Sequence, residues 1–206
     1  MTPLRISLTA LAIATIIMTQ AYSGPPGGRR GVDETMKNHP EPKSVDTAVA
    51  AYSNPAIENY RKVVQLPNAA QQPRDGSRIV VDVTTGGDAA KLNPGIEKLS
   101  RFVNIYAAAG KVPAKANIAV VLHGDATLVI LSADAYTKRF NSKGNPNLDC
   151  LHGLHEAGVE ILVCGQSLIA KGAELEDVVF FADVAVSALT SLVNLQADGH
   201  AYVPLK

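Results

Sequence analysis

The stretch that decides the fold is Gly158-Val159-Glu160-Ile161-Leu162-Val163-Cys164-Gly165-Gln166-Ser167. Its first half is β-branched and apolar apart from Glu160 and lies between two glycines, which is typical of an interior strand of a parallel sheet. We predict a strand that ends at Cys164 and a short helix that follows it. In open α/β sheets, ligands bind beyond the carboxyl ends of the strands, and a thiol at a helix start favours its thiolate form. Cys164 is therefore the first candidate nucleophile, with the alternative of a small buried apolar residue, a common role of free cysteine.

Outward from this stretch, strand-like and helix-like segments alternate. The expected strands are 77–85, 116–124, 158–164, a weak one at 178–182, and 201–204. The expected helices are 93–109, 132–140, 148–157, a short one after Cys164, and 186–196, whereas 126–131 fits either a short strand or a turn of helix. This alternation predicts one α/β domain, 77–206, in three layers, helix–sheet–helix, around a mainly parallel sheet.

The segment before this domain, 24–76, reads as a proline-rich arm. It contains Pro25, Pro26, Pro40, Pro42, Pro55, Pro67 and Pro73 and shows little periodicity. We expect its first half to be disordered. Asn54 followed by proline resembles a capped helix start, so we expect the second half to pack on the domain or on a neighbouring subunit.

The first 23 residues have the pattern of a secretory signal peptide. Arg5 is their only charge, an apolar run extends from Ile6 to Met18, and Ala21-Tyr22-Ser23 follows. The run is shorter than the roughly 20 residues that a membrane-spanning helix needs. We therefore expect a periplasmic or secreted protein that has no membrane association once the signal is removed.

Composition limits the partners and cofactors. The 19 basic and 19 acidic residues balance, and no basic stripe is interleaved with aromatic residues, so no nucleic-acid partner is expected. The glycine loop Thr84-Thr85-Gly86-Gly87-Asp88 lacks both the lysine of a P-loop and the Gly-x-Gly-x-x-Gly pattern of a dinucleotide site. No cofactor and no metal are predicted.

The second cysteine, Cys150, precedes Cys164 by 14 residues, which is neither a Cys-x-x-Cys redox motif nor a zinc spacing. A ten-residue helix and a six-residue strand both span about 15–20 Å, so the helix start and the strand end reach the same sheet edge. Cys150 is thus a second candidate, either bridged to Cys164 or packed beneath its helix.

Of His123, His152 and His155, only His123 is a candidate for the site. His123 ends a predicted strand and is a candidate base or orienting group on the Cys164 edge. His152 points to nearly the opposite side of its helix from Cys150, so the two do not share a metal ion. His155 flanks an apolar stripe, and we expect it to be partly buried.

Two motifs carry a resemblance to a known family. The segment from Glu156 to Ser167, together with Ala188-Leu189-Thr190-Ser191-Leu192-Val193-Asn194-Leu195-Gln196-Ala197-Asp198-Gly199-His200-Ala201-Tyr202, resembles the DsrE/DsrF-like family. The resemblance covers about Arg78 to Lys206, includes the His123-Gly124 strand end, and leaves the arm unexplained. It implies a small α/β domain that forms trimers or hexamers and passes persulfide sulfur through one cysteine, here Cys164. The export signal departs from the pattern, since the understood relays are cytoplasmic.

Two hypotheses from different classes follow. In the first, Cys164 exchanges sulfane sulfur with a donor or acceptor protein, and the backbone amides of Gly165, Gln166 and Ser167 stabilise the negative charge. In the second, the protein is a non-catalytic oligomer that binds a small molecule or a partner, with Cys164 buried or bridged to Cys150. Whether the chain is an enzyme stays open. The segment 184–195 is apolar around most of its helix, which predicts a homo-oligomer, unless the arm covers the exposed face.

Overall fold

The computed structural model describes residues 52–109 and 114–205, and every structural statement below refers to these ranges. The predicted signal peptide and the first half of the arm lie outside them. Within them, no helix combines the length and the apolar character that crossing a membrane requires.

A five-stranded parallel sheet forms the centre of the molecule. Its strands are β3 (Ser77–Val83), β4 (Ala116–Leu122), β5 (Glu160–Cys164), β6 (Asp183–Ala185) and β7 (Ala201–Leu205), in the spatial order β6-β5-β4-β3-β7. The helices are α1 (Pro94–Ala107), α2 (Ala133–Phe140), α3 (Leu148–Glu156), α4 (Gly165–Ala170) and α5 (Ala188–Ala197), with 3-10 turns η2 (Gly124–Ile130) and η3 (Leu175–Asp177). A short antiparallel pair, β1 (Tyr52–Ser53) and β2 (Val63–Val64), precedes the sheet.

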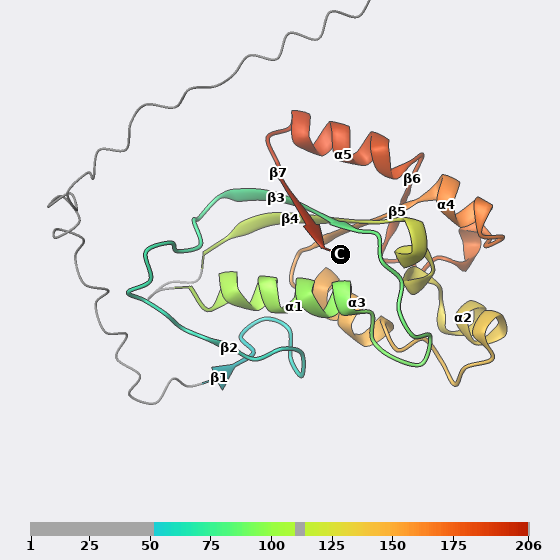
Figure 1. Cartoon of the computed structure of the whole chain (residues 1–206), viewed down its shortest axis with the longest axis horizontal. Coiled ribbons are helices and arrows are strands. Elements are labelled where there is room, and N and C mark those ends of the chain that lie inside the picture. The colour runs from blue at the N-terminus through green and yellow to red at the C-terminus, as the bar shows by residue number, and fades with distance from the viewer. Residues whose placement is uncertain (1–51, 110–113, 206) are drawn as a thin grey trace, which may run out of the picture. The chain divides into compact units, whose positions relative to one another are not determined.

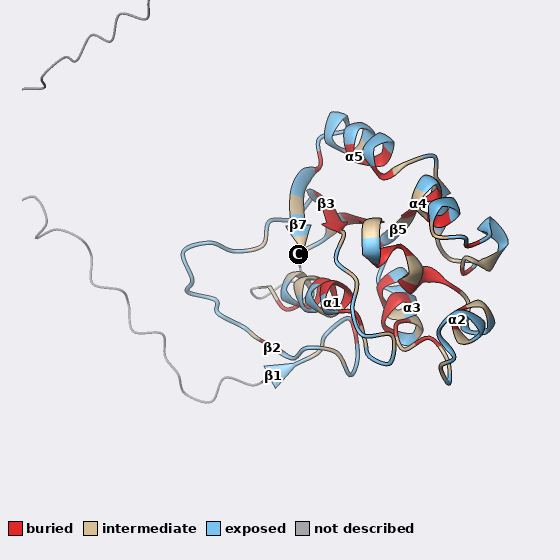
Figure 2. Cartoon of the chain, turned by 45° about the vertical axis from the view of Figure 1, so that its right-hand side comes forward, coloured by how far each residue is buried: buried red, intermediate tan, exposed pale blue. Residues whose placement is uncertain are grey.

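Helices cover both faces of the sheet (Figures 1 and 2). On one face, alternate residues of β3 and β4, such as Val81 and Val120, pack in the larger core with residues of α1 and α3. On the other face, Val80, Val121 and Cys164 pack against the buried side of α5. Strands buried on both faces read as continuous apolar runs, which is why these strands were recognisable in the sequence. The three-layer α/β fold and its parallel sheet are confirmed.

Three expectations about individual elements were wrong or incomplete. The expected strand 178–182 is absent: Val178 forms only an isolated bridge with Leu131, and the edge strand is β6 instead. An edge strand has one neighbour and one sheltered face, so it needs little apolar sequence. The last helix begins at Ala188 because the Ser187 hydroxyl accepts a hydrogen bond from the Thr190 amide at 3.1 Å. The ambiguous segment near 126–131 is the 3-10 turn η2.

The arm after residue 51 packs on α1, as expected, but without the helix predicted at Asn54. Instead, the fully buried Asn104 of α1 binds this segment through four hydrogen bonds. Its Oδ1 accepts from the amides of Ala56 and Ile57 at 3.0 and 2.8 Å, and its Nδ2 donates to the carbonyls of Ile57 and Tyr60 at 3.2 and 3.0 Å. Ile57, only 2% exposed, joins the larger core.

This anchor gives a stability prediction. Asn104→Ala is expected to lower the free energy of unfolding by about 3 kcal/mol, because it leaves buried backbone groups without partners. The matched control is Glu97→Ala, which removes the exposed Arg61–Glu97 ion pair between the same two segments and should cost less than about 1 kcal/mol. Denaturant unfolding measures both. Equal losses in the two variants would contradict the anchoring role of Asn104.

Candidate functional site

Cys164 is the last residue of β5 and lies at the carboxyl edge of the sheet, on the face that α5 covers. It is 5% exposed. The chain leaving β5 forms α4, whereas the chain leaving β6 crosses to α5. Adjacent parallel strands whose connections diverge in this way leave the crevice in which α/β proteins bind ligands. The prediction that Cys164 ends a strand at this edge of the sheet is therefore confirmed.

Four hydrogen bonds surround the Cys164 sulfur. They involve the Ser167 side chain and the backbone amides of Ala188, Ser167 and Gln166. Burial raises the pKa of Cys164, but these hydrogen bonds outweigh it, and the pKa lies below the ordinary value of 9.0. Because the amides belong to the first turns of α4 and α5, the thiolate is stabilised by two helix starts, one more than the sequence indicated.

Gly165 was expected to stabilise negative charge through its backbone amide, but the structure shows a role in packing. A Cβ atom at this position would lie 3.0 Å from the Ala185 carbonyl oxygen and 3.2 Å from Val184 Cγ1. A side chain here would therefore push α4 and β6 apart by a few tenths of an ångström, whereas glycine lets α4 begin directly against β6. This close approach keeps the start of α5, which follows β6, within reach of the Cys164 sulfur.

His123 follows β4 directly and shares the Cys164 edge. The paired registers end at Leu122 and Val163, so the next positions along the two strands are His123 and Cys164. Its Nε2 lies 2.7 Å from Asp82 Oδ1, and the Tyr202 hydroxyl donates to Asp82 Oδ2 at 2.6 Å. The hydrogen bond to the Asp82 carboxylate is the main cause that raises the pKa of Tyr202.

Sequence reasoning missed Asp82 and Tyr202. Asp82 is the one charged residue in the apolar run from Ile79 to Val83, and its carboxylate is nearly buried, since the residue is 7% exposed. A charge inside a central strand requires a partner, and this was the available signal. Which partner it finds depends on the order of the strands, because β7 is last in sequence yet lies beside β3.

Cys150 is not part of this site. Both cysteines are free, and Cys150 lies fully buried in the larger core on the opposite face of the sheet. Burial raises the pKa of Cys150 to about 12. The lengths of α3 and β5 bring the start of α3 to the edge where β5 ends, but the two cysteine side chains lie on opposite faces of the sheet. The bridged alternative is therefore not formed in this structure.

The two histidines of α3 also lie away from Cys164. The rings of His152 and His155 both pack on Phe181, and the centroid of each histidine ring lies 5.5 Å from that of the Phe181 ring. His155 is exposed, so the expectation of partial burial was wrong. Among the described residues, no group of three or more His, Cys, Asp and Glu side chains is arranged to hold a metal ion.

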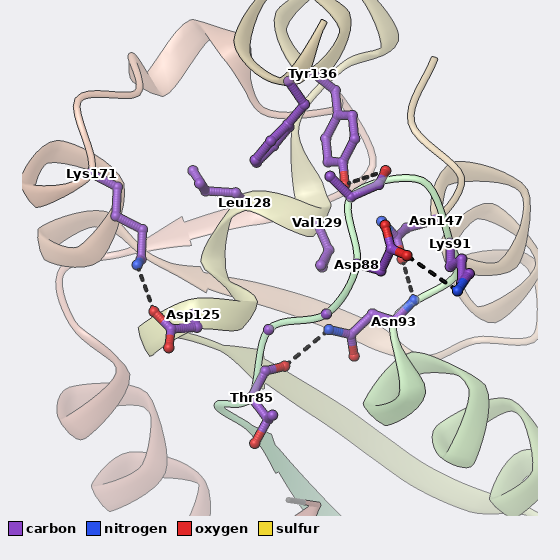
Figure 3. Close-up of a pocket in the computed structure, with 14 residues that line it drawn as sticks. Thr85, Asp88, Lys91, Asn93, Asp125, Leu128, Val129, Tyr136, Asn147 and Lys171 are labelled. Atoms are coloured by element: carbon purple, nitrogen blue, oxygen red, sulfur yellow. Dashed lines mark hydrogen bonds and ion pairs between the residues drawn. The ribbon is translucent and has the colours of Figure 1, made fainter. Parts of the chain in front are cut away.

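A cavity of about 460 Å³ lies at the same edge of the sheet, but neither Cys164 nor His123 lines it (Figure 3). Its charged side chains are paired, Lys171 with Asp125 at 3.0 Å and Lys91 with Asp88 at 3.2 Å. The buried Asn93 holds the loop after β3 by donating to the Thr85 carbonyl at 2.9 Å. These polar groups pair with one another, and no cysteine lines the cavity.

Comparison with known proteins identifies a family for this chain. The model of the DsrE/DsrF-like family matches residues 79–205. The chain belongs to the DsrE/DsrF-like family. This confirms the resemblance drawn from the two motifs, and membership of the family suggests a function of the sulfur-relay type.

Solved structures include a similar protein. It is a protein of unknown function from Methanobacterium thermoautotrophicum, 22% identical, with a TM-score of 0.46 over 63% of this chain and 99% of that chain. No curated protein matches the chain.

Proposed function

We propose that this protein accepts sulfane sulfur on Cys164 and passes it to an acceptor thiol. The observation that carries the proposal is the position of Cys164 at the carboxyl end of β5, beside the starts of α4 and α5, where hydrogen bonds from Ser167 and from these helix starts lower its pKa. A buried thiol that served only packing would have its pKa raised, as Cys150 does. Membership of the DsrE/DsrF-like family supports the same chemistry.

The exchange is a displacement at sulfur. The Cys164 thiolate attacks the outer sulfur of a donor persulfide, R–S–S–H, whose S–S bond breaks, so that the donor leaves as R–S⁻ and takes up a proton. Cys164 then carries the outer sulfur as a persulfide, and attack by an acceptor thiolate on that sulfur regenerates the Cys164 thiolate. The amides that lower the pKa of Cys164 also make it a good leaving group.

Transfer of labelled sulfur tests the proposal. The chain is incubated with polysulfide carrying radioactive outer sulfur, freed of excess reagent, and mixed with a thiol acceptor. We expect label to reach the acceptor with the wild-type chain, to be lost with Cys164→Ser, and to persist with the matched variant Cys150→Ala. Undiminished transfer by Cys164→Ser would overturn the assignment.

We also propose that the protein acts outside the cytoplasm, in the periplasm or as a secreted protein, on the basis of the signal-like sequence of residues 1–23. Its donor or acceptor protein would then be exported as well. Fractionation of cells that express the full chain tests this. Recovery of the uncleaved chain in the cytoplasm would contradict it.

We further propose a homo-oligomer, a trimer or hexamer, assembled through the outer face of α5. Leu189 and Val193 lie four positions apart on α5 and are 74% and 64% exposed, and Val186, which precedes the helix, is 74% exposed. An apolar stripe of this kind on a helix requires cover. The same face favours the second candidate function, a non-catalytic oligomer in which Cys164, already 5% exposed, is sealed.

The assembly proposal predicts a change of mass. Leu189→Asp is expected to reduce the particle mass measured by light scattering to that of one chain, because a carboxylate would be buried in the apolar contact. The matched control is Asn194→Asp, which places the same charge at an exposed polar position of α5 and should leave the assembly intact. A wild-type chain that is already monomeric at micromolar concentration would contradict the proposal.

A further inference from the structure

We infer that Asp82 and Tyr202 hold His123 as the proton carrier for the thiol that exchanges sulfur with Cys164. The inference rests on the proposed function. It gives a role to Asp82, His123 and Tyr202, which have none if Cys164 alone transfers sulfur. Two features of the structure support it: the fixed orientation of the imidazole, and the independence of the Cys164 sulfur from that imidazole.

The orientation of His123 follows from the two oxygens of Asp82. Oδ1 is 2.7 Å from His123 Nε2, and Oδ2 accepts from the Tyr202 hydroxyl at 2.6 Å. Donation by Nε2–H to the carboxylate leaves the lone pair of the neutral ring on Nδ1. Nδ1 has no hydrogen-bond partner within the described ranges. The Tyr202 hydrogen bond keeps the second oxygen occupied, so the carboxylate holds one orientation.

The position of the ring is set by the sheet. His123 and Cys164 follow the last paired residues of neighbouring parallel strands, which are about 4.8 Å apart. Both lie on the α5 face, as the contact with Asp82 and the packing of Cys164 show. His123 therefore flanks the volume that a sulfur compound must enter to reach the Cys164 sulfur.

Cys164 does not need His123 for its own ionisation. Its sulfur is already engaged by the Ser167 side chain and by the amides of Gln166, Ser167 and Ala188, and these lower its pKa. In cysteine hydrolases the histidine activates the nucleophile, whereas here that task is performed by the Ser167 side chain and backbone amides. His123 is therefore free to exchange a proton with the thiol of the donor or acceptor. The sulfur of that thiol lies in line with the S–S bond.

The proton transfer balances in both directions. When Cys164 donates, Nδ1 of His123 takes the proton of the acceptor R–S–H, and R–S⁻ attacks the outer sulfur of the Cys164 persulfide. The S–S bond breaks, R–S–S–H forms, and Cys164 leaves as thiolate beside an imidazolium. When Cys164 accepts, the imidazolium returns its proton to the departing R–S⁻. No external oxidant or reductant is required.

Acceptor thiols of graded acidity test this role. The full chain and its His123→Gln variant are loaded with polysulfide, the loading is measured by mass spectrometry, and transfer is timed with a series of thiols from weakly to strongly acidic. The glutamine amide can still donate to Asp82, but it carries no base. We expect transfer to the weakly acidic thiols to slow about a hundredfold. The loss should shrink steadily as the thiol becomes more acidic, because an ionised thiol has no proton to give.

Two further variants separate proton transfer from structural support. In Asp82→Asn the amide oxygen accepts from the Tyr202 hydroxyl, so the amide nitrogen donates to the ring. This moves the ring proton to Nδ1 and should reproduce the acidity-dependent loss. Tyr202→Phe keeps the tautomer and should cause a smaller loss of the same kind. A loss equal for all thiols, or no loss with His123→Gln, overturns the inference. Failure of the wild-type chain to load overturns the proposed function itself, and the inference with it.

Discussion

In the folded chain, a small alkylating reagent such as iodoacetamide is expected to modify Cys164 near neutral pH while leaving Cys150 unmodified. The hydrogen bonds around Cys164 lower its pKa despite burial, so its thiolate fraction at neutral pH exceeds that of an ordinary thiol. A rise in the pKa of Cys150 from 9.0 to about 12 lowers its thiolate fraction about a thousandfold, and the residue has no exposed surface.

Mass spectrometry of the digested protein measures both rates as a function of pH. The rate for Cys164 should rise with pH and level off at a lower pH than for a free thiol, since its thiolate forms earlier. Ser167→Ala removes one hydrogen bond and should shift this curve towards higher pH. In denaturant the two cysteines should react alike. A native Cys164 as inert as Cys150 would favour the non-catalytic alternative.

Gly165→Val is expected to lower the free energy of unfolding by about 3 kcal/mol and to slow the alkylation of Cys164. Even the first carbon of the new side chain would lie 3.0 Å from the Ala185 carbonyl oxygen. The start of α4 or strand β6 must therefore move, and either movement changes the hydrogen bonds to the Cys164 sulfur. The loss of stability and the loss of reactivity should thus appear together.

The matched control is Ala170→Val, which places a valine at the exposed end of the same helix, α4, and should change stability by less than about 1 kcal/mol. Denaturant unfolding and the alkylation rate of Cys164 report the two effects. A Gly165→Val variant with native stability and native reactivity would contradict the close packing of α4 on β6.

The sequence was sufficient to predict the elements that are buried on both faces. The strand ending at Cys164 and the helix opened by Asn93 appeared where expected, because continuous apolar runs and a capped helix start are local signals. The edge strand β6 was missed because it is short and only partly sheltered. The turns after Asn54 were taken for a helix because their structure depends on Asn104, some 50 residues further along the chain.

The candidate site was predictable only in part, for a similar reason. Cys164 and His123 end strands, and a strand end can be recognised from a local run of residues. Asp82 and Tyr202 take their places from the order of the strands, which puts β7 beside β3. The role of Cys150 was uncertain because helix and strand lengths show at which edge of the sheet the residue lies, but not on which face its side chain packs. The amide of Ala188 reaches the Cys164 sulfur through a crossover that no local pattern reveals.

The central claim is that Cys164 takes up sulfane sulfur, and the most direct measurement is peptide mapping by mass spectrometry after brief exposure of the folded chain to polysulfide. The account predicts one added sulfur atom on the peptide that contains Cys164. It predicts none on the peptide that contains Cys150, and none in the Cys164→Ser variant. Sulfur found equally on both cysteines, or no sulfur on Cys164 while a free small thiol in the same solution is modified, would contradict it.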